Sequence, residues 1–446
     1  MLIDKDISIH LSCQQFECNQ LDINEDKTVL LFRSRQDSRD VVCPFCGSRV
    51  HVYDTAHATL KDMPLWHGVP LSLEVEHHRY RCTCCSRSFS EELCMRYPGT
   101  RVTCRAAKWV QELLRWHLPV SAVHEITGFH WDTIRRIHES VMQEALDLRR
   151  RELQGTDYRP QYLAIDEFAV HKGHRYATCV MDLAEGDILW VGKGRSKADF
   201  ARFFEEFDLG YLSEVKAVAM DMNASYNILV EQHLPQAEIV YDRYHMQAQF
   251  GKDVLGVVRL QEARAHKQQS KELLETSRQE ESDEERRHLQ AKARKESRLY
   301  SALKSSRWIL LANSENLSPQ KARNLNAILD SHSDLALCYA MKEEMCNMFD
   351  LRNPNDARKR WTQWFEAAKA SGIPALAKFA ELKEKRIEGL VAHARYSIST
   401  RRLEGFNNKI KVAKRIGYGY RNEDYFFTLI RYMSIPAVRS QSPRKT

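Results

Sequence analysis

Two acidic residues of the chain follow short apolar stretches at equivalent places. Asp166 lies in the segment YLAIDEF, and Asp221 lies in the later segment VKAVAMDM. An acid directly after a buried strand is held rigidly at the edge of a sheet, where a metal ion can reach it. Either acid alone is weak evidence, because acids at strand ends commonly cap a turn or a helix. Their recurrence at two strand ends predicts a metal site built from carboxylates.

A third acid lies near the C-terminal end, in the segment RRLEGFNNKIKVAKR. Apolar residues recur there at helical spacing, which predicts an amphipathic helix with Glu404 on its polar face. Residues 401–421 hold seven Lys or Arg and one acid, whereas a merely solvated helix face would carry more mixed charge. The polar neighbours expected beside Glu404 are Asn407, Asn408 and Lys411. The basic residues expected to contact DNA are Arg401, Arg402, Lys409, Lys414 and Arg415.

Carboxylates in this arrangement suit the cleavage of phosphodiester bonds. That reaction must stabilise charge on the attacking and leaving oxygens, and two magnesium ions about 3.5–4 Å apart do so. Carboxylates are the hard oxygen ligands that magnesium, or manganese in its place, prefers. We therefore assign Asp166, Asp221 and Glu404 to two such ions, with Asp166 bridging both from a central strand. Asp242 and His245, after the next strand, are placed in the same site without a defined role.

Four cysteines have the spacing of a structural zinc site. Cys43 and Cys46 form one C-x-x-C pair followed by glycine, and Cys82 and Cys85 form a second pair. Two such knuckles can supply four thiolates at the corners of a tetrahedron, and a small hairpin sheet must fill the segment between them. The alternative is a chance clustering of core cysteines, and Cys84 could replace either neighbour as a ligand. Two nearby cysteines are expected to be ordinary buried thiols: Cys94 and Cys104.

The segment after the cysteines predicts three helices. VTCRAAKWVQELLRWH is amphipathic, and PVSAVHEITGFHWDTIRRIHESV contains two more helical stretches joined at Gly128. Two helices joined by a glycine-containing turn form the helix-turn-helix pattern, whose second helix lies in a DNA major groove. A plain helical hairpin is the alternative. The candidate DNA contacts on the second helix, roughly residues 130–138, are Trp131, Asp132, Thr133, Arg135 and Arg136.

The order of these signals divides the chain into parts. Three short strands in succession, followed by alternating helix and strand, predict a mixed sheet covered by helices. Strand signals then end, and a charged helical stretch precedes returning aromatic residues at Trp308, Tyr339, Phe349, Trp361, Trp364 and Phe365. This pattern predicts an ordered helical insertion rather than a linker. The predicted parts are a zinc-binding module (1–98), a helix-turn-helix segment (99–155), a first core part (156–256), a helical insertion (257–390), a last core part (391–436) and a disordered tail (437–446).

Composition limits the class of protein. A chain of 446 residues with 43% hydrophobic content has room for two or three domains, and its net charge of +7 is modest for this length. We find no run of 18 uncharged apolar residues, and the start MLIDKDISIH lacks a basic and apolar leader pattern. We therefore expect a cytoplasmic protein without a membrane partner, whose cysteines are reduced thiols or metal ligands.

The ordered combination of zinc knuckles, helix-turn-helix, IDEF, MDM, D-x-x-H and LEGFNNKIK followed by YGYR resembles the ISL-three family of insertion-sequence transposases. The resemblance covers nearly the whole chain. It implies an α/β fold with an RNase H-like core, interrupted by a helical insertion before the glutamate, and an Asp, Asp, Glu triad at Asp166, Asp221 and Glu404. It also implies zinc at the four cysteines and binding of the terminal inverted repeats by the zinc and helix-turn-helix modules. Members often carry Asn shortly before the glutamate, where this chain has Thr400.

The resemblance predicts the partners and sets the alternatives. A transposase binds inverted repeats and target DNA, and pairing two ends predicts at least a homodimer on DNA, associated with the bacterial nucleoid. A DNA-binding regulator derived from a transposase would need the zinc and helix-turn-helix modules but not the carboxylates. A structure-selective nuclease with an RNase H-like core would need no sequence-reading module and would hydrolyse DNA without joining ends.

Overall fold

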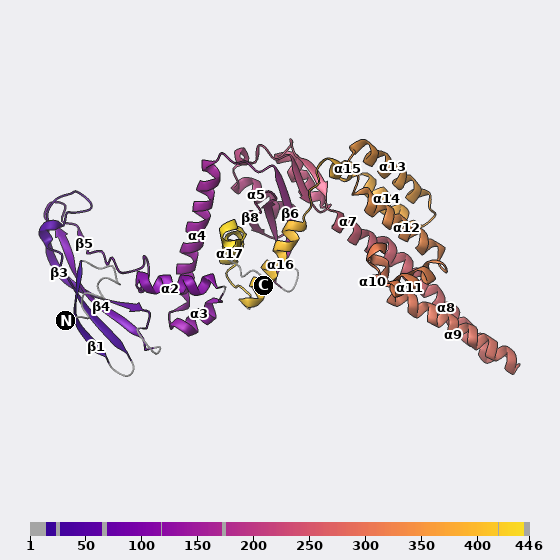
Figure 1. Cartoon of the computed structure of the whole chain (residues 1–446), viewed down its shortest axis with the longest axis horizontal. Coiled ribbons are helices and arrows are strands. Elements are labelled where there is room, and N and C mark those ends of the chain that lie inside the picture. Colours follow the sequence, from indigo (N-terminus) through magenta and orange to yellow (C-terminus); the bar gives the residue numbers. More distant parts are fainter. Residues whose placement is uncertain are drawn as a thin grey trace. The chain divides into compact units, whose positions relative to one another are not determined.

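The computed structural model describes residues 15–23, 27–64, 69–116, 118–171, 175–417 and 419–440. Contacts between residues divide the chain into two compact units (Figure 1). The first unit combines Met1–Gln154 with Ile410–Tyr432, and the second combines Gly155–Lys409 with Met433–Thr446. The segment 391–436, expected as one last part of the core, is therefore shared between the two units.

The first unit begins with a five-stranded sheet, and the second cysteine knuckle starts at Cys82, the last residue of one of its strands. Its strand order is β1-β2-β4-β3, and β5 pairs with β4. Alternate residues of β4 are buried, and Leu71, Leu73 and Val75 pack against Phe16 and Phe32 from the first two strands. The expected hairpin between the knuckles is the antiparallel pair β3 and β4. The elements are β1 Phe16–Ile23, β2 Thr28–Ser34, η1 Ser38–Asp40, β3 Val50–Asp62, β4 Leu71–Cys82 and β5 Ser88–Ser90.

Helices complete the first unit. Val110 of α2, Val123 of α3 and Ile134 of α4 are fully buried in one shared core. Thr103 caps α2, and its side chain accepts a hydrogen bond from the amide of Ala106. The helix expected over residues 130–138 is longer, because it continues as α4. The elements are α2 Cys104–Arg115, α3 Val120–Thr127, α4 Trp131–Gly155, the latter part of α16 Arg401–Ile416, and α17 Glu423–Ser434.

The second unit contains a mixed five-stranded sheet with the order β10-β9-β6-β7-β8. Strands β6, β7 and β8 are antiparallel neighbours, whereas β9 and β10 run parallel to β6. On one face, Phe200 of α5 and Tyr226 of α6 pack against Leu163 and Val218. Successive strand residues face opposite sides, and Ala392 of α15 packs on the other face. The elements are β6 Tyr162–His171, β7 Arg175–Asp182, β8 Ile188–Lys193, α5 Lys197–Glu206, η2 Leu209–Leu212, β9 Ala217–Met220, α6 Ala224–His233 and β10 Glu238–Tyr241.

A run of helices lies between β10 and the C-terminal helix α16, where the helical insertion was expected. Its core contains Tyr339, Phe349, Trp361, Trp364 and Phe365. Trp308, one of the aromatic residues from which an ordered insertion was predicted, is 73% exposed, and Arg307 lies over its ring. The elements are α7 Arg243–Phe250, the π-helix η3 Gly251–Leu255, α8 Gly256–Gln279, α9 Asp283–Ser305, α10 Arg307–Leu311, η4 Ser314–Asn316, α11 Pro319–Leu329, α12 Ser333–Met348, α13 Pro354–Ala370, α14 Pro374–Glu384 and α15 Ile387–Arg395.

The last described residues form the short helix α18, Pro436–Ser440. A disordered tail was expected from residue 437, and the helix differs from this because proline fits the first turn of a helix. The rest of that tail, residues 441–446, lies outside the described residues. Among the described helices, none has the length and apolar character needed to cross a membrane.

Candidate functional site

Three acids of the second unit lie at one level of the sheet. The parallel registers of β6 with β9 and of β9 with β10 each advance residue by residue. Continuing them places Asp166, Asp221 and Asp242 in one row across three neighbouring strands. Asp166 is not at the end of its strand, as the sequence suggested, because β6 continues as a hairpin with β7 to His171. It lies instead just past the point where β6 stops pairing with β9.

His245 occupies the centre of this row. Its Nε2 atom is 3.9 Å from Asp166 Oδ1, and its Nδ1 atom is 3.6 Å from Asp221 Oδ2. Asp242 caps helix α7 and accepts hydrogen bonds from the amides of Tyr244 and His245. The strand end, the cap and the first turn of α7 thus fix the imidazole between the two acids.

Helix α16 brings the third predicted acid to the same place. Glu404, His245 and Asp242 each offer a ligand atom, and these atoms all lie within 4.8 Å of one another. Thr400, which is fully buried, donates its amide to Asp242 Oδ2 at 3.0 Å and its hydroxyl to Glu404 Oε1 at 3.4 Å. Thr400 therefore orients two carboxylates at once. The tightest metal-like cluster is Asp242, His245 and Glu404, whereas Asp166 and Asp221 contact opposite sides of the imidazole.

Asp166 is largely enclosed by its surroundings. Its side chain is 14% exposed, and it accepts hydrogen bonds from the Glu167 amide and from Asn407 Nδ2, both at 2.8 Å. Burial raises the pKa of Asp166 to about 6, and repulsion from Glu404 adds to this, while the Glu167 amide and His245 lower it. A proton at near-neutral pH relieves the crowding of carboxylates, and a cation would do the same.

The donor set suits a hard divalent cation. Asp166, Asp221, Asp242 and Glu404 supply carboxylate oxygens around one imidazole, and oxygen ligands are those that magnesium prefers. The buried Oδ1 atom of Asn407 has no hydrogen-bond partner among the described residues. An acceptor left in this state beside Asp166 fits a water molecule held by a metal ion.

The sequence did not predict two basic residues near Asp221, Lys383 and Arg386. Burial and the neighbouring charge of Arg386 lower the pKa of Lys383, whereas attraction to Asp221 raises it. Arg386 donates to the carbonyl of Met222, directly after Asp221. Both lie on or just after α14 of the insertion, far from the motifs in sequence. The nearest signal was the basic run KEKR at the end of a predicted helix.

Other predicted residues of α16 have different surroundings. Asn407 is buried with the apolar face rather than sharing an exposed face with Asn408 and Lys411, which are exposed. Arg402 donates to the carbonyls of Leu183, Ala184 and Glu185 in the turn between β7 and β8. This guanidinium holds a turn, so it is a weaker candidate for DNA binding than the exposed residues. Besides Arg402, which is also exposed, the exposed or half-buried basic residues of the helix are Arg401, Lys409, Lys411, Lys414 and Arg415.

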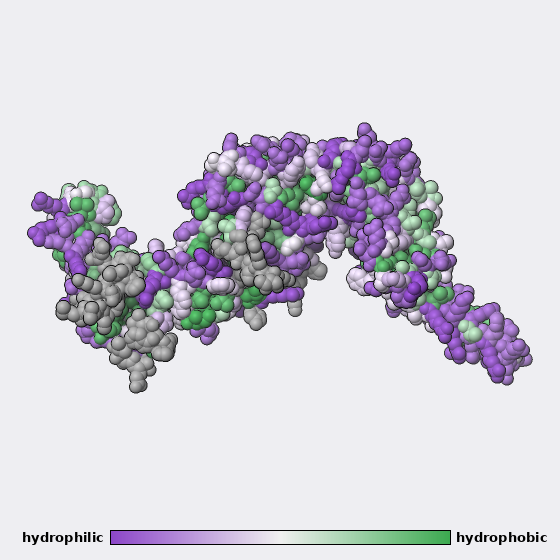
Figure 2. All heavy atoms as spheres, viewed as in Figure 1, coloured by the Kyte–Doolittle hydropathy of each residue, from purple (hydrophilic) through white to green (hydrophobic). Residues whose placement is uncertain are grey.

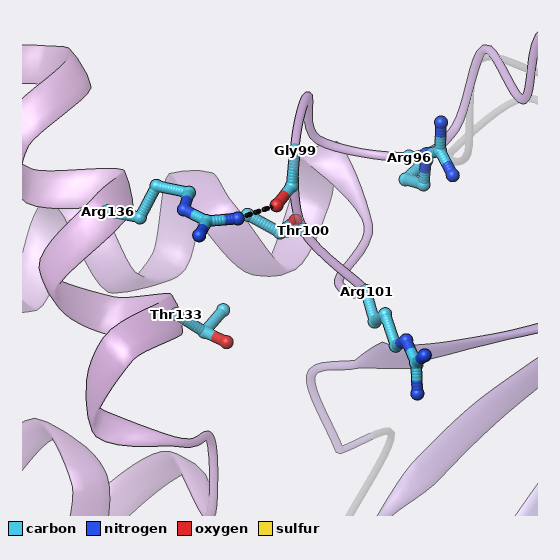
Figure 3. A pocket seen from close by; sticks show the side chains of 6 residues that line it. All are labelled: Arg96, Gly99, Thr100, Arg101, Thr133 and Arg136. Atoms are coloured by element: carbon cyan, nitrogen blue, oxygen red, sulfur yellow. Dashed lines mark hydrogen bonds between the residues drawn. The ribbon is translucent and has the colours of Figure 1, made fainter.

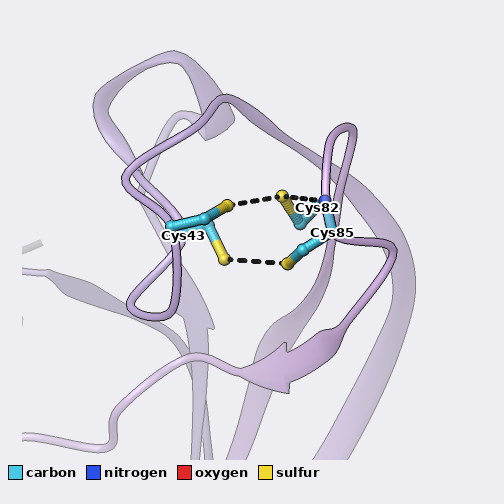
Figure 4. A group of neighbouring side chains, drawn as sticks. Cys43, Cys82 and Cys85 are labelled. Carbon is cyan, nitrogen blue, oxygen red and sulfur yellow. Dashed lines mark hydrogen bonds between the residues drawn. The ribbon is translucent and has the colours of Figure 1, made fainter.

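The four predicted cysteines of the first unit come together. Their sulfurs all lie within 4.8 Å of one another. The Sγ atoms of Cys43 and Cys85 are 3.7 Å apart (Figure 4). The Sγ atoms of Cys46 and Cys82 are 3.5 Å apart. Four thiolates about 2.3 Å from a tetrahedral zinc ion would be about 3.8 Å apart, so the cluster fits that ion. Hydrogen bonds from the side chain and amide of Ser48 and from Cys82 lower the pKa of Cys46 to about 6, which favours the thiolate that binds metal.

The remaining thiols near this cluster differ from expectation. Cys84 contributes its amide to Cys82 Sγ, at 3.3 Å, and its sulfur is not part of the group of four. Cys94 is exposed and Cys104 is half-buried, so neither is the buried core thiol that was expected. Cys104 begins helix α2, directly after its capping residue Thr103.

The two predicted DNA-reading helices are joined by a short turn. Helix α3 ends at Gly128, which has a left-handed φ of 67°, and α4 begins three residues later. Trp131, Asp132 and Arg136 are exposed at the start of α4, and Thr133 is half-buried. Arg135 instead lies along its own helix, with Nε 3.4 Å from Glu139 Oε1. The residues available to a ligand are therefore those of the first turn and Arg136.

A basic pocket lies beside this helix. Its volume is about 420 Å³, and Arg136 donates a hydrogen bond across it to the carbonyl of Gly99 (Figure 3). Three arginines line this pocket, and arginine binds phosphate oxygens in a planar, bidentate manner. The lining residues are Arg96, Gly99, Thr100, Arg101, Thr133 and Arg136.

Comparison with known proteins gives consistent matches. A model of the ISL3 family, described as a transposase, matches residues 163–430. The chain is 34% identical over 393 residues to the transposase for insertion sequence element IS1001 of Bordetella parapertussis, covering 88% of each chain. It is 23% identical over 407 residues to the transposase for insertion sequence element IS1557 of Mycobacterium tuberculosis, covering 87% of this chain and 84% of the relative.

Proposed function

Because the chain belongs to the ISL-three family of insertion-sequence transposases, we propose that it cuts DNA at the ends of its own element and joins the freed 3′ ends to target DNA. The observation that carries this proposal is the row of Asp166, Asp221 and Asp242 across three neighbouring parallel strands, together with Glu404 of α16 beside it.

The sheet of the second unit is proposed to be an RNase H-like core. Three antiparallel strands followed by two parallel strands, with helices on both faces, support this assignment. The insertion between β10 and α16 supports it further, because the glutamate is separated in sequence from the two aspartates but not in space. Asp166 lies just past the point where β6 stops pairing with β9, and Asp221 and Asp242 directly follow β9 and β10, which are rigid positions for metal ligands.

Asp166, Asp221 and Glu404 are the proposed ligands of two magnesium or manganese ions. Such a pair of ions would stabilise the attacking and the leaving oxygen of the scissile phosphate. Asp166 is assigned to both ions, since it lies on the central strand and contacts Asn407 and His245 from its two oxygens. Asn407 holds one Asp166 oxygen in place, and Thr400 holds Glu404.

Asp242 and His245 are proposed as a positioning pair that also adds ligand atoms. Asp242 fixes the start of α7 and the amide of Thr400, so it aligns His245 with Glu404. Lys383 and Arg386 add positive charge beside Asp221, which suits a bound DNA strand. The site therefore combines fixed acids with cations that approach from the insertion.

The first unit is proposed to bind the terminal inverted repeats. Zinc at Cys43, Cys46, Cys82 and Cys85 would hold the two knuckles together, and α4 would enter a major groove with Trp131, Thr133 and Arg136 foremost. The basic pocket beside α4 supports a phosphate contact. Two ends must be paired, so a homodimer on DNA in the bacterial nucleoid is part of the proposal.

Incubation of the purified chain with a labelled element end, target DNA and magnesium tests the proposal. We expect cleavage at the end and a joined product containing the labelled 3′ end. Binding without cleavage would favour a regulator, and nicking of any sequence without a joined product would favour a structure-selective nuclease. Either result would overturn the transposition activity proposed for this chain.

A further inference from the structure

Two histidines and two glutamates meet in the helical insertion, away from the acids of the sheet. Glu262 and His266 lie one helical turn apart on α8, Glu296 lies on α9, and His332 directly precedes α12. The Nε2 atoms of His266 and His332 are 2.9 Å apart. Glu262, His266 and His332 each offer a ligand atom, and these atoms lie within 4.8 Å of one another.

The second nitrogen of each imidazole is already engaged. His266 Nδ1 is hydrogen-bonded to Glu296 Oε2, and His332 Nδ1 lies 2.7 Å from the carbonyl oxygen of Ile328. A carboxylate and a carbonyl can only accept, so each Nδ1 must carry the proton. In the neutral rings, both Nε2 lone pairs then face one another at 2.9 Å. Two lone pairs repel at that distance, so either a shared proton or a metal ion must lie between them.

The surroundings select a metal ion of the zinc class for this position. Histidine ligands of metals usually donate the other ring N–H to a carboxylate or a backbone carbonyl, and both forms occur here. Two nitrogens about 2.05 Å from a tetrahedral zinc ion would be about 3.3 Å apart, so only a small outward movement is needed. The Glu262 carboxylate supplies a third ligand from the same face of α8.

We propose that Glu262, His266 and His332 bind a zinc-like divalent transition metal, with Glu296 positioning His266. The role is structural. The long hairpin of α8 and α9 has a hydrophilic surface (Figure 2), and several buried positions between its helices are small or polar: Ala263, Ser270, Ser277 and Ala293. A metal ion joining α8 to the start of α12 would anchor the hairpin to the aromatic core of the insertion.

Zinc content of the purified full-length chain tests the site. His332→Gln removes one ligand, and His288→Gln is the matched control, because His288 is an exposed histidine of α9 outside the cluster. After loading with zinc and dialysis, we expect His332→Gln to contain one zinc equivalent fewer per chain than wild type and His288→Gln. Equal zinc content in all three proteins would overturn the proposal and would mean that a proton occupies the position.

Two further measurements keep the test decisive. With cobalt in place of zinc, His332→Gln should keep the thiolate-to-cobalt absorption of the four cysteines unchanged, which shows that only the second site is lost. If circular dichroism shows that His332→Gln does not fold, the zinc content of Glu262→Gln tests the site instead, because Glu262 lies on the half-buried face of α8. Glu296→Gln should weaken zinc binding about 10–100-fold while leaving the three ligands in place. Unchanged zinc affinity in both glutamate variants would contradict the site.

Discussion

The cysteine cluster of the first unit and the acidic site of the second unit are assembled in opposite ways. The four cysteines come from two tight turns, so their spacing along the chain already describes the site. The acids come from three neighbouring strands and from a helix that follows a long insertion, so only the register of the sheet brings them together. Local spacing thus encodes the proposed structural metal site, whereas topology encodes the site of proposed chemistry.

The largest effect is expected from substitutions that disrupt the acidic site alone. Asp166→Asn or Asp221→Asn should lower metal-dependent cleavage of an element end by about 10³-fold or more, because each removes a charged metal ligand. Binding of the same DNA, measured by fluorescence anisotropy, should change less than twofold. Glu205→Gln, an exposed acid of α5, is the control and should cleave normally. Full cleavage by Asp166→Asn would exclude this residue as an essential ligand.

Residues close to the predicted acids show where sequence reasoning succeeds and where it stops. The helical insertion, the mixed sheet and the four knuckle cysteines follow from periodicity and spacing. The central place of His245 does not, because it depends on the alignment of β10 with β9. Lys383 lies in a helix whose packing direction no local pattern specifies. Arg402 carried a suitable charge, but its use in holding a turn depends on a hairpin more than 200 residues away.

A cysteine substitution should affect the first unit instead. Cys46→Ser removes one of four proposed zinc ligands, and roughly a quarter of about 12 kcal/mol of metal-linked folding energy is about 3 kcal/mol. We expect loss of zinc and a lower free energy of unfolding for the first unit, measured by denaturant titration. Cys84→Ser is the matched control, since its sulfur lies outside the group of four. Equal destabilisation by Cys84→Ser would instead support Cys84 as a ligand.

A stability measurement in magnesium-free buffer examines the charge of the acidic site. The pKa of Asp166 is raised from 3.8 to about 6, so the folded chain holds this proton longer than the unfolded chain. The stabilisation that this proton gives the folded chain is complete below pH 4 and is lost as pH rises through about 6. At pH 8 Asp166→Asn should therefore be about 2–3 kcal/mol more stable than wild type, since one pKa unit corresponds to about 1.4 kcal/mol.

Two comparisons check the cause of that difference. At pH 4 wild type and Asp166→Asn should unfold at nearly the same denaturant concentration, because both carry a neutral side chain there. Added magnesium at pH 8 should stabilise wild type and leave Asp166→Asn nearly unchanged, because binding to the folded state raises stability. If Asp166→Asn were more stable than wild type by the same amount at pH 4 and pH 8, the cause would be better packing rather than removal of a buried charge.

The smallest effect is expected from substitutions that distinguish the backbone conformations of the two cysteine knuckles. Gly47 and Ser86 each follow the second cysteine of a pair, and their φ angles are 69° and 56°. A side chain in this left-handed region costs about 1–2 kcal/mol, whereas glycine adds about 0.4–1 kcal/mol of unfolded-state entropy. Ser86→Gly should therefore stabilise the zinc-loaded chain by about 0.5 kcal/mol. Gly47→Ala should destabilise it by a similar amount, since an added Cβ meets nothing within 4 Å, and a larger loss would point to an unseen contact at the first knuckle.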